Sequence, residues 1–196
     1  MKISTILRSL LIIIVGIPAM ASAQTKWMNP TDANEPYICG RAWNTEMGKS
    51  YNRLPQRFKA TVPGRVWGNS TMTAGLTVRF ATTSPNIAVK YVCTSRSYGT
   101  FNLSGMVHSG VDLYGKAADG KMHWIGNHMR WSMKGDTITI SFPKLSVPAN
   151  RRTEYTLYLP NYNGVKWLAV GVDGKSDFQF MRQSKERPVV IYGSSI

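Results

Sequence analysis

The sequence predicts an all-β protein whose main domain, residues 61–182, is a two-sheet β-sandwich of the jelly-roll type. Three observations lead to this prediction. From Val62 onward the chain consists of short runs in which apolar and polar residues alternate, the pattern of half-buried strands. Clusters of Gly, Pro, Asn and Asp separate these runs, as turns separate the strands of a sandwich. With 196 residues and only 2 cysteines, the chain is long enough to bury a core without a disulfide framework.

Seven runs are expected to form the strands of this sandwich. They are residues 76–80, 87–92, 107–114, 122–125, 137–142, 155–159 and 165–172. Asp119-Gly120 separates the third run from the fourth, and Asp-Gly between alternating segments is a strong hairpin signal. Most of these runs are apolar on one face only, so two sheets must pack face to face to bury those faces.

Residues 1–23 have the pattern of a secretory signal peptide. Lys2 and Arg8 provide positive charge, an apolar run follows over residues 10–17, and small residues end at Ala23, after which we expect cleavage. The apolar run is shorter than the ~20 residues of a membrane-spanning helix. The mature protein is therefore expected to be secreted or periplasmic, with no stable membrane span.

Residues 24–60 are expected to be an irregular segment that packs on the sandwich, with Trp43 and Phe58 as large apolar anchors. Cys39 and Cys93 could form a disulfide in an exported protein or remain buried free thiols. The sequence leaves both possibilities open.

The net charge of +14 falls to +12 when Lys2 and Arg8 are removed with the signal peptide. The basic residues are scattered and no nucleic-acid-binding motif accompanies them, which argues against nucleic acid as a partner. Anionic glycans or membrane surfaces are the more natural partners of an exported basic protein.

Histidines and tryptophans are the other candidates for a binding site. The three histidines, His108, His123 and His128, have no Cys or carboxylate at zinc-like spacing, so we expect neither a metal nor a cofactor. In a strand, His108 would share a face with Asp112 and Tyr114. Trp124 and Trp131 flank a loop and are candidates for an aromatic platform under a sugar ring.

The last segment, residues 183–196, is expected to be a linker and the first strand of a second domain. Residues 188–192 form a continuous apolar run, which is typical of a strand buried on both faces of a parallel sheet. Gly193 and Ser195 follow it directly. A buried strand that ends in Gly-x-Ser can present a nucleophilic serine at a sharp turn.

Two motifs resemble those of SGNH/GDSL-type esterases. Residues 189–196 (VVIYGSSI) are similar to the first block of such hydrolases, and residues 110–114 (GVDLY) are similar to the GxDLY motif of the β-sandwich that precedes them. The resemblance implies that Ser195 stands at the nucleophile position and Gly193 at the motif glycine. It also implies that Gly110, Asp112, Leu113 and Tyr114 are the residues of the GxDLY motif.

The resemblance implies an exported serine esterase that deacylates a polysaccharide or another ester and needs no cofactor. The sequence has no later block with the family's catalytic His and Asp or its oxyanion donors, and a lone serine is a weak nucleophile. We therefore expect an accessory domain followed by an orphan strand of a missing α/β hydrolase domain, inactive as given. The alternatives are a free-standing carbohydrate-binding β-sandwich and an exported protein that binds anionic partners through its basic surface.

Overall fold

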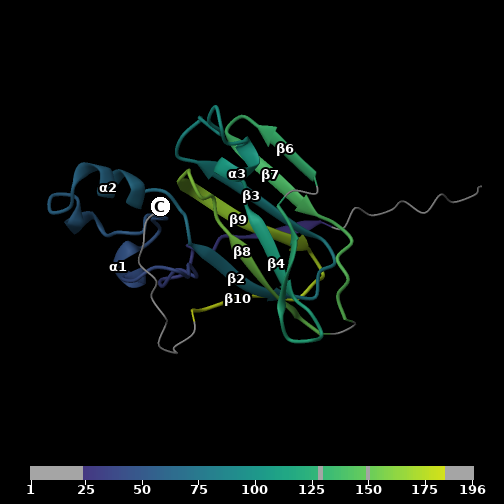
Figure 1. The fold of residues 1–196 in the computed structure, drawn as a ribbon. Helices are drawn as coiled ribbons and strands as arrows, with labels where there is room; N and C mark the ends of the chain where they lie inside the picture. Colours follow the sequence, from purple (N-terminus) through teal and green to yellow (C-terminus); the bar gives the residue numbers. More distant parts are fainter. Residues whose placement is uncertain (1–23, 128–129, 149–150, 184–196) are drawn as a thin grey trace, which may run out of the picture.

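The computed structural model describes residues 24–127, 130–148 and 151–183, and the strands in these ranges form two five-stranded antiparallel sheets. Sheet 1 has the order β1 (Thr25–Met28), β9 (Val165–Asp173), β3 (Ile87–Cys93), β7 (Thr137–Phe142) and β6 (Arg130–Lys134). Sheet 2 has the order β10 (Phe178–Met181), β2 (Thr77–Thr82), β8 (Thr153–Tyr158), β4 (Asp112–Lys116) and β5 (Met122–Gly126). The sheets pack face to face (Figure 1), which confirms the predicted all-β sandwich.

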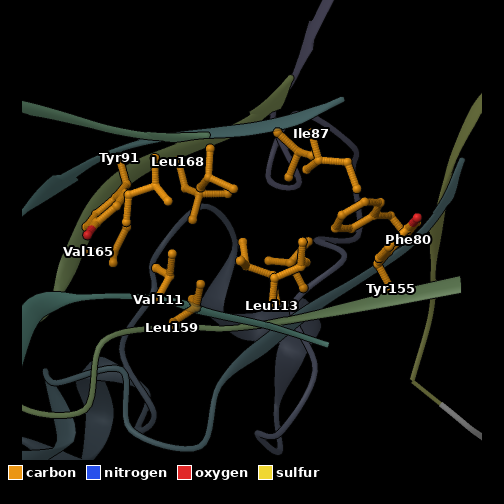
Figure 2. Packing of buried hydrophobic residues seen from close by; sticks show 14 of the residues in the cluster. Phe80, Ile87, Tyr91, Val111, Leu113, Tyr155, Leu159, Val165 and Leu168 are labelled. Carbon is orange, nitrogen blue, oxygen red and sulfur yellow. The ribbon is translucent and has the colours of Figure 1, made fainter. Parts of the chain in front are cut away.

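The core lies between the two sheets and is built by the alternation that the sequence displays. In β3 every second side chain, from Ile87 to Cys93, is buried. Leu168 of sheet 1 and Phe80 and Leu113 of sheet 2 are completely buried, and they point toward one another across the gap (Figure 2). Each such side chain contributes about 1.5–3 kcal/mol by leaving water, so the core fixes the register of both sheets.

Three strands were not predicted: β1, β6 and β10. Two of them, β1 and β10, have four residues each and lie at sheet edges, where a strand is too short to show a clear alternation. β1 pairs with β9, so the segment 24–60, expected to be irregular, begins with a strand of the sandwich.

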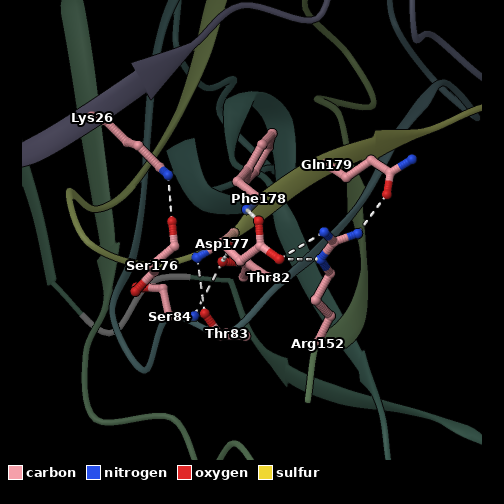
Figure 3. Close-up of polar contacts among 9 residues, drawn as sticks. All are labelled: Lys26, Thr82, Thr83, Ser84, Arg152, Ser176, Asp177, Phe178 and Gln179. Carbon is pink, nitrogen blue, oxygen red and sulfur yellow. Dashed lines mark hydrogen bonds and ion pairs between the residues drawn. The ribbon is translucent and has the colours of Figure 1, made fainter. Parts of the chain in front are cut away.

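A polar network holds β10 against the rest of sheet 2 (Figure 3). The Asp177 carboxylate, just before β10, pairs with the Arg152 guanidinium at 2.6 Å, and this hydrogen-bonded pair lowers the pKa of Asp177. The Thr82 hydroxyl donates to the Asp177 carbonyl at 2.6 Å, and the Lys26 ammonium donates to the carbonyl of Ser176. The network therefore joins β1 and β2 to the start of β10.

The predicted strand 107–114 is wrong in its first half. Residues Gly105–Ser109 form a short helix, α3, and β4 begins only at Asp112. The Ser104 hydroxyl caps α3 by accepting from the Val107 N–H. His108 is therefore helical and does not share a strand face with Asp112 and Tyr114.

Helices α1 (Asn44–Met47) and α2 (Gly64–Ser70), with a 3₁₀ helix at Gln56–Phe58 between them, project from one side of the sandwich (Figure 1). Trp43 contacts Phe58 at a ring distance of 5.1 Å, but it is 44% exposed. The expectation that this pair anchors the segment to the core is therefore wrong for Trp43. Ile38 and Tyr51, which are 1% and 3% exposed, belong to the core instead.

Cys39 and Cys93 are buried free thiols, which decides between the two alternatives that the sequence left open. Burial raises the pKa of Cys93 to about 11. The predicted signal peptide and the predicted strand over residues 188–192 lie outside the described residues.

Candidate functional site

Gly110 joins α3 to β4 and permits a close approach of two backbone segments. Its N–H donates to the Met106 carbonyl at 3.0 Å. A Cβ atom added at Gly110 would lie 2.3 Å from that carbonyl oxygen, a distance that no side chain tolerates. Leu113, three residues later, is completely buried, so these two motif residues build the sandwich.

Asp112 and Tyr114 are the motif residues on the outer face of sheet 2. The Asp112 carboxylate accepts a hydrogen bond of 3.0 Å from the indole N–H of Trp124 in β5. Tyr114 makes an edge-on ring contact of 5.3 Å with Tyr158 in β8. Trp124 is 58% exposed and Tyr158 is 44% exposed. We call this set of four residues the motif face.

The motif face follows from strand register. Tyr114 lies opposite Trp124 in β5, and Asp112 lies opposite Tyr158 in β8, so all four side chains point away from the core. The hydrogen bond that the Trp124 indole donates to Asp112 restricts the indole to one orientation. The result is an ordered aromatic surface with one carboxylate, which suits binding and contains no nucleophile.

A buried polar cluster lies behind the motif strand, under α3. The Ser109 hydroxyl is 2.9 Å from Nδ1 of His108 and accepts from the side-chain amide of Asn163 at 3.1 Å. The Tyr91 hydroxyl donates to the Ser109 carbonyl at 2.8 Å. Ser109, Asn163 and His108 are 2%, 2% and 8% exposed. This cluster is placed to hold α3 and the loop that contains Asn163 together.

The sequence-predicted aromatic platform is divided between the sheets. Trp124 lies in β5 of sheet 2, whereas Trp131 lies in β6 of sheet 1, so the two are not neighbours on one strand pair. Ser195 and Gly193 lie outside the described residues, as does His128. His123 pairs with Asp119 at 3.1 Å on the exposed hairpin. In the described ranges no three His, Cys, Asp or Glu side chains gather as a possible metal site.

The sequence did not identify Trp27 or Trp167 as candidates for a binding surface. Trp27 and Trp167 are 37% and 40% exposed, both on sheet 1. The alternation around Trp167 misleads because the register of β9 against β3 shifts between Val92 and Cys93. β1 has only four residues, Thr25–Met28, so its sequence shows no alternation that would have identified Trp27 as a surface residue.

No helix in the described part of the chain is long and apolar enough to cross a membrane. No protein of curated function matches the chain.

Two solved structures are similar to it. A protein named as a GDSL-like lipase from Bacteroides ovatus is 27% identical with a TM-score of 0.66, over 80% of this chain and 43% of that chain. Salicylyl-acyltransferase SsfX3 from a tetracycline biosynthetic pathway is 16% identical with a TM-score of 0.53, over 84% of this chain and 43% of that chain. The second likeness concerns the fold alone. The chain thus spans less than half the length of either protein.

The family match covers the sandwich from its first strand to the start of its last. Residues 25–178 match the family described as GxDLY, the N-terminus of SGNH-hydrolase-type esterases. The motif residues Gly110, Asp112, Leu113 and Tyr114 lie within this match and occupy the junction and face described above. The chain therefore belongs to the GxDLY family of N-terminal domains of SGNH-hydrolase-type esterases.

Proposed function

We propose that this chain is the non-catalytic N-terminal part of an exported SGNH-type ester hydrolase that removes acyl groups from a polysaccharide. The proposal rests on one observation: the residues of the GxDLY motif have two different structural roles. Gly110 and Leu113 serve the fold, whereas Asp112 and Tyr114 order an exposed aromatic surface. None of the four is placed to attack an ester.

The buried Ser109–His108 contact does not supply a catalytic pair. A serine nucleophile needs a base that can take its proton and a path for the ester to reach its oxygen. The Ser109 hydroxyl is held by Asn163 and is 2% exposed, so an ester cannot reach it. Structural support of α3 accounts for these hydrogen bonds without any reaction.

The motif face is suited to contact a hydrolase domain. Aromatic side chains such as Trp124 and Tyr158 are typical of the centre of a protein interface, and both are exposed here. β10, the last strand of the described chain, belongs to the same sheet as the motif strand. The GDSL-like lipase of similar fold is more than twice as long as the part matched by this chain.

The test of this proposal is ester turnover by the mature chain, residues 24–196. With p-nitrophenyl acetate we expect no hydrolysis above the rate in buffer, for the wild-type chain and for Ser195→Ala and Ser109→Ala alike. Turnover by the wild-type chain that either substitution abolishes would overturn the non-catalytic role. Export has its own test: the protein recovered outside the cytoplasm should begin at Gln24.

A further inference from the structure

The outer face of sheet 1, on the opposite side of the sandwich from the motif face, has an unusual composition. Its described side chains are mostly tryptophan, lysine, small residues and hydroxyl residues, with Val92 and Asp173 as the exceptions. They come from β1, β9, β3, β7 and β6 and include Trp27, Trp167, Ala169, Gly171, Ala88, Lys90, Thr139, Ser141, Ser132 and Lys134. We call this surface the Trp27 face.

Trp27 packs against Gly171 of the sheet. A Cβ atom added at Gly171, which lies opposite Trp27 on β9, would be 2.7 Å from Cζ3 of the indole. The ring therefore rests directly on the glycine, and Trp27 remains 37% exposed. An indole that presents part of its surface to solvent in a fixed orientation is suited to stack on a flat apolar ligand face, such as that of a sugar ring.

Trp167 provides a second aromatic surface on the same strand that carries Gly171. It is 40% exposed and lies four residues from Gly171, a distance of about 13 Å along a strand that rises ~3.3 Å per residue. The small side chain of Ala169 lies between them and is buried. Two aromatic side chains separated by this distance can contact different sugars of one extended chain.

Cations lie between and beside these aromatic side chains. The Lys90 ammonium is 4.2 Å from the centre of the Trp27 ring. Neither Lys90 nor Lys134 has a carboxylate partner within the described residues. The one described acid at the end of this face, Asp173, is held by Ser84 and Asn86. The face is therefore positively charged and has no competing acid at its centre.

We propose that the Trp27 face binds an anionic polysaccharide, with sugar rings on Trp27 and Trp167 and carboxylate groups at Lys90. The hydroxyls of Thr139, Ser141 and Ser132 lie on the neighbouring strands. Within the described residues these hydroxyls have no hydrogen-bond partner, and they are placed to bond the sugar hydroxyls. This inference rests on the proposed function, because it takes the polysaccharide that carries the ester as the ligand. It adds the surface that binds this polysaccharide.

The experiment titrates polygalacturonate into the mature chain, residues 24–196, by calorimetry. We expect binding that weakens as salt rises, because ionic strength screens the contacts of exposed lysines. Trp27→Ala should weaken binding about tenfold or more, as loss of a central aromatic contact does, whereas Trp27→Tyr should retain most of it. Lys90→Gln should weaken binding and reduce its dependence on salt. Trp43→Ala, an exposed tryptophan beside α1 and outside both outer faces, is the matched control and should bind as the wild type does.

Four outcomes would overturn the proposal. Equal binding of fully methyl-esterified polygalacturonate would show that the anion is not recognised, and equal binding of polyglutamate would show that the sugar is not. Binding lost in Trp124→Ala but kept in Trp27→Ala would place the ligand on the motif face. Binding of anionic phospholipid vesicles without binding of polygalacturonate would identify a membrane surface instead.

Far-UV circular dichroism of each variant confirms that it is folded. Failure here leaves the turnover test above unaffected, so the two proposals fail separately.

Discussion

Replacement of Asn163 by alanine tests whether the loop before β9 is held by one buried side chain. The Asn163 amide oxygen accepts from the Gly164 N–H at 2.9 Å and from the Ser95 N–H at 3.1 Å. The amide nitrogen donates to the Ser109 hydroxyl at 3.1 Å and to the Ser95 carbonyl at 3.1 Å. One side chain thus connects the end of β3, the start of β9 and α3.

The cost of Asn163→Ala follows from the groups that lose a partner. The Gly164 N–H is buried, and a buried group left without a partner costs about 1–3 kcal/mol. The Ser109 hydroxyl loses one hydrogen bond but keeps its contact with Nδ1 of His108, so it adds less. Water can reach Ser95, which is exposed, so it adds little. We expect a loss of about 2 kcal/mol in the free energy of unfolding, which lowers the melting temperature by about 4–8 °C in a domain of this size.

The assay is urea and thermal unfolding, followed by tryptophan fluorescence and circular dichroism. The control is Asn161→Ala, an exposed asparagine of the same loop, which should change the unfolding free energy by less than about 0.5 kcal/mol. If Asn163→Ala were no more destabilising than Asn161→Ala, the cluster under α3 would not hold the loop, and the structural explanation of the Ser109–His108 contact would fail with it.

Two further predictions concern the close backbone contact at Gly110 and the buried thiols of Cys39 and Cys93. Gly110→Ala should destabilise by about 1–3 kcal/mol or more, because its Cβ would collide with backbone; Gly68→Ala in α2, where a Cβ meets nothing within 4 Å, should be neutral or slightly stabilising in the same unfolding assay. The thiols of Cys39 and Cys93 should react with Ellman's reagent only after unfolding. Because burial raises the pKa of Cys93 from 9.0 to about 11, its contribution to stability is complete below pH 9 and is lost as the pH rises toward 11. If the folded protein reacted with Ellman's reagent at once, Cys93 would not be buried as the structure shows. A free energy of unfolding that stayed constant between pH 9 and pH 11 would contradict the raised pKa.

The strands with the cleanest alternation were predictable. Residues 137–142 form β7 at the predicted bounds, because burial on one face imposes period two on the sequence. The run 107–114 was misassigned because a five-residue helix is too short to display a helical period. Helix α3 begins after the N-cap residue Ser104 and ends before the C-cap residue Gly110. A pattern of alternating apolar residues does not reveal these caps.

The candidate site was predictable in its residues but not in its geometry. The letters of the GxDLY motif identified Asp112, but its partner Trp124 comes from another strand, and a single sequence does not give the register between strands. Trp43 could not be placed either, since it adopts a left-handed conformation at φ +52° that favours glycine and is rare for a bulky residue.

The two outer faces differ in how their charges are compensated, and this difference bears on which partner each face can bind. On sheet 2, Glu154 is 3.3 Å from Lys116 and 3.9 Å from Arg79. Such exposed pairs add little to stability, but Glu154 offsets part of the positive charge around the motif face. On sheet 1, Lys90 and Lys134 keep their charge, since the described residues offer them no acid. The proposed polyanion would therefore be attracted to the Trp27 face, and the motif face would stay free for the proposed hydrolase domain. Under these two proposals, the substrate would bind on one side of the sandwich and the hydrolase domain on the other. Such an arrangement requires a long substrate, which a polysaccharide is.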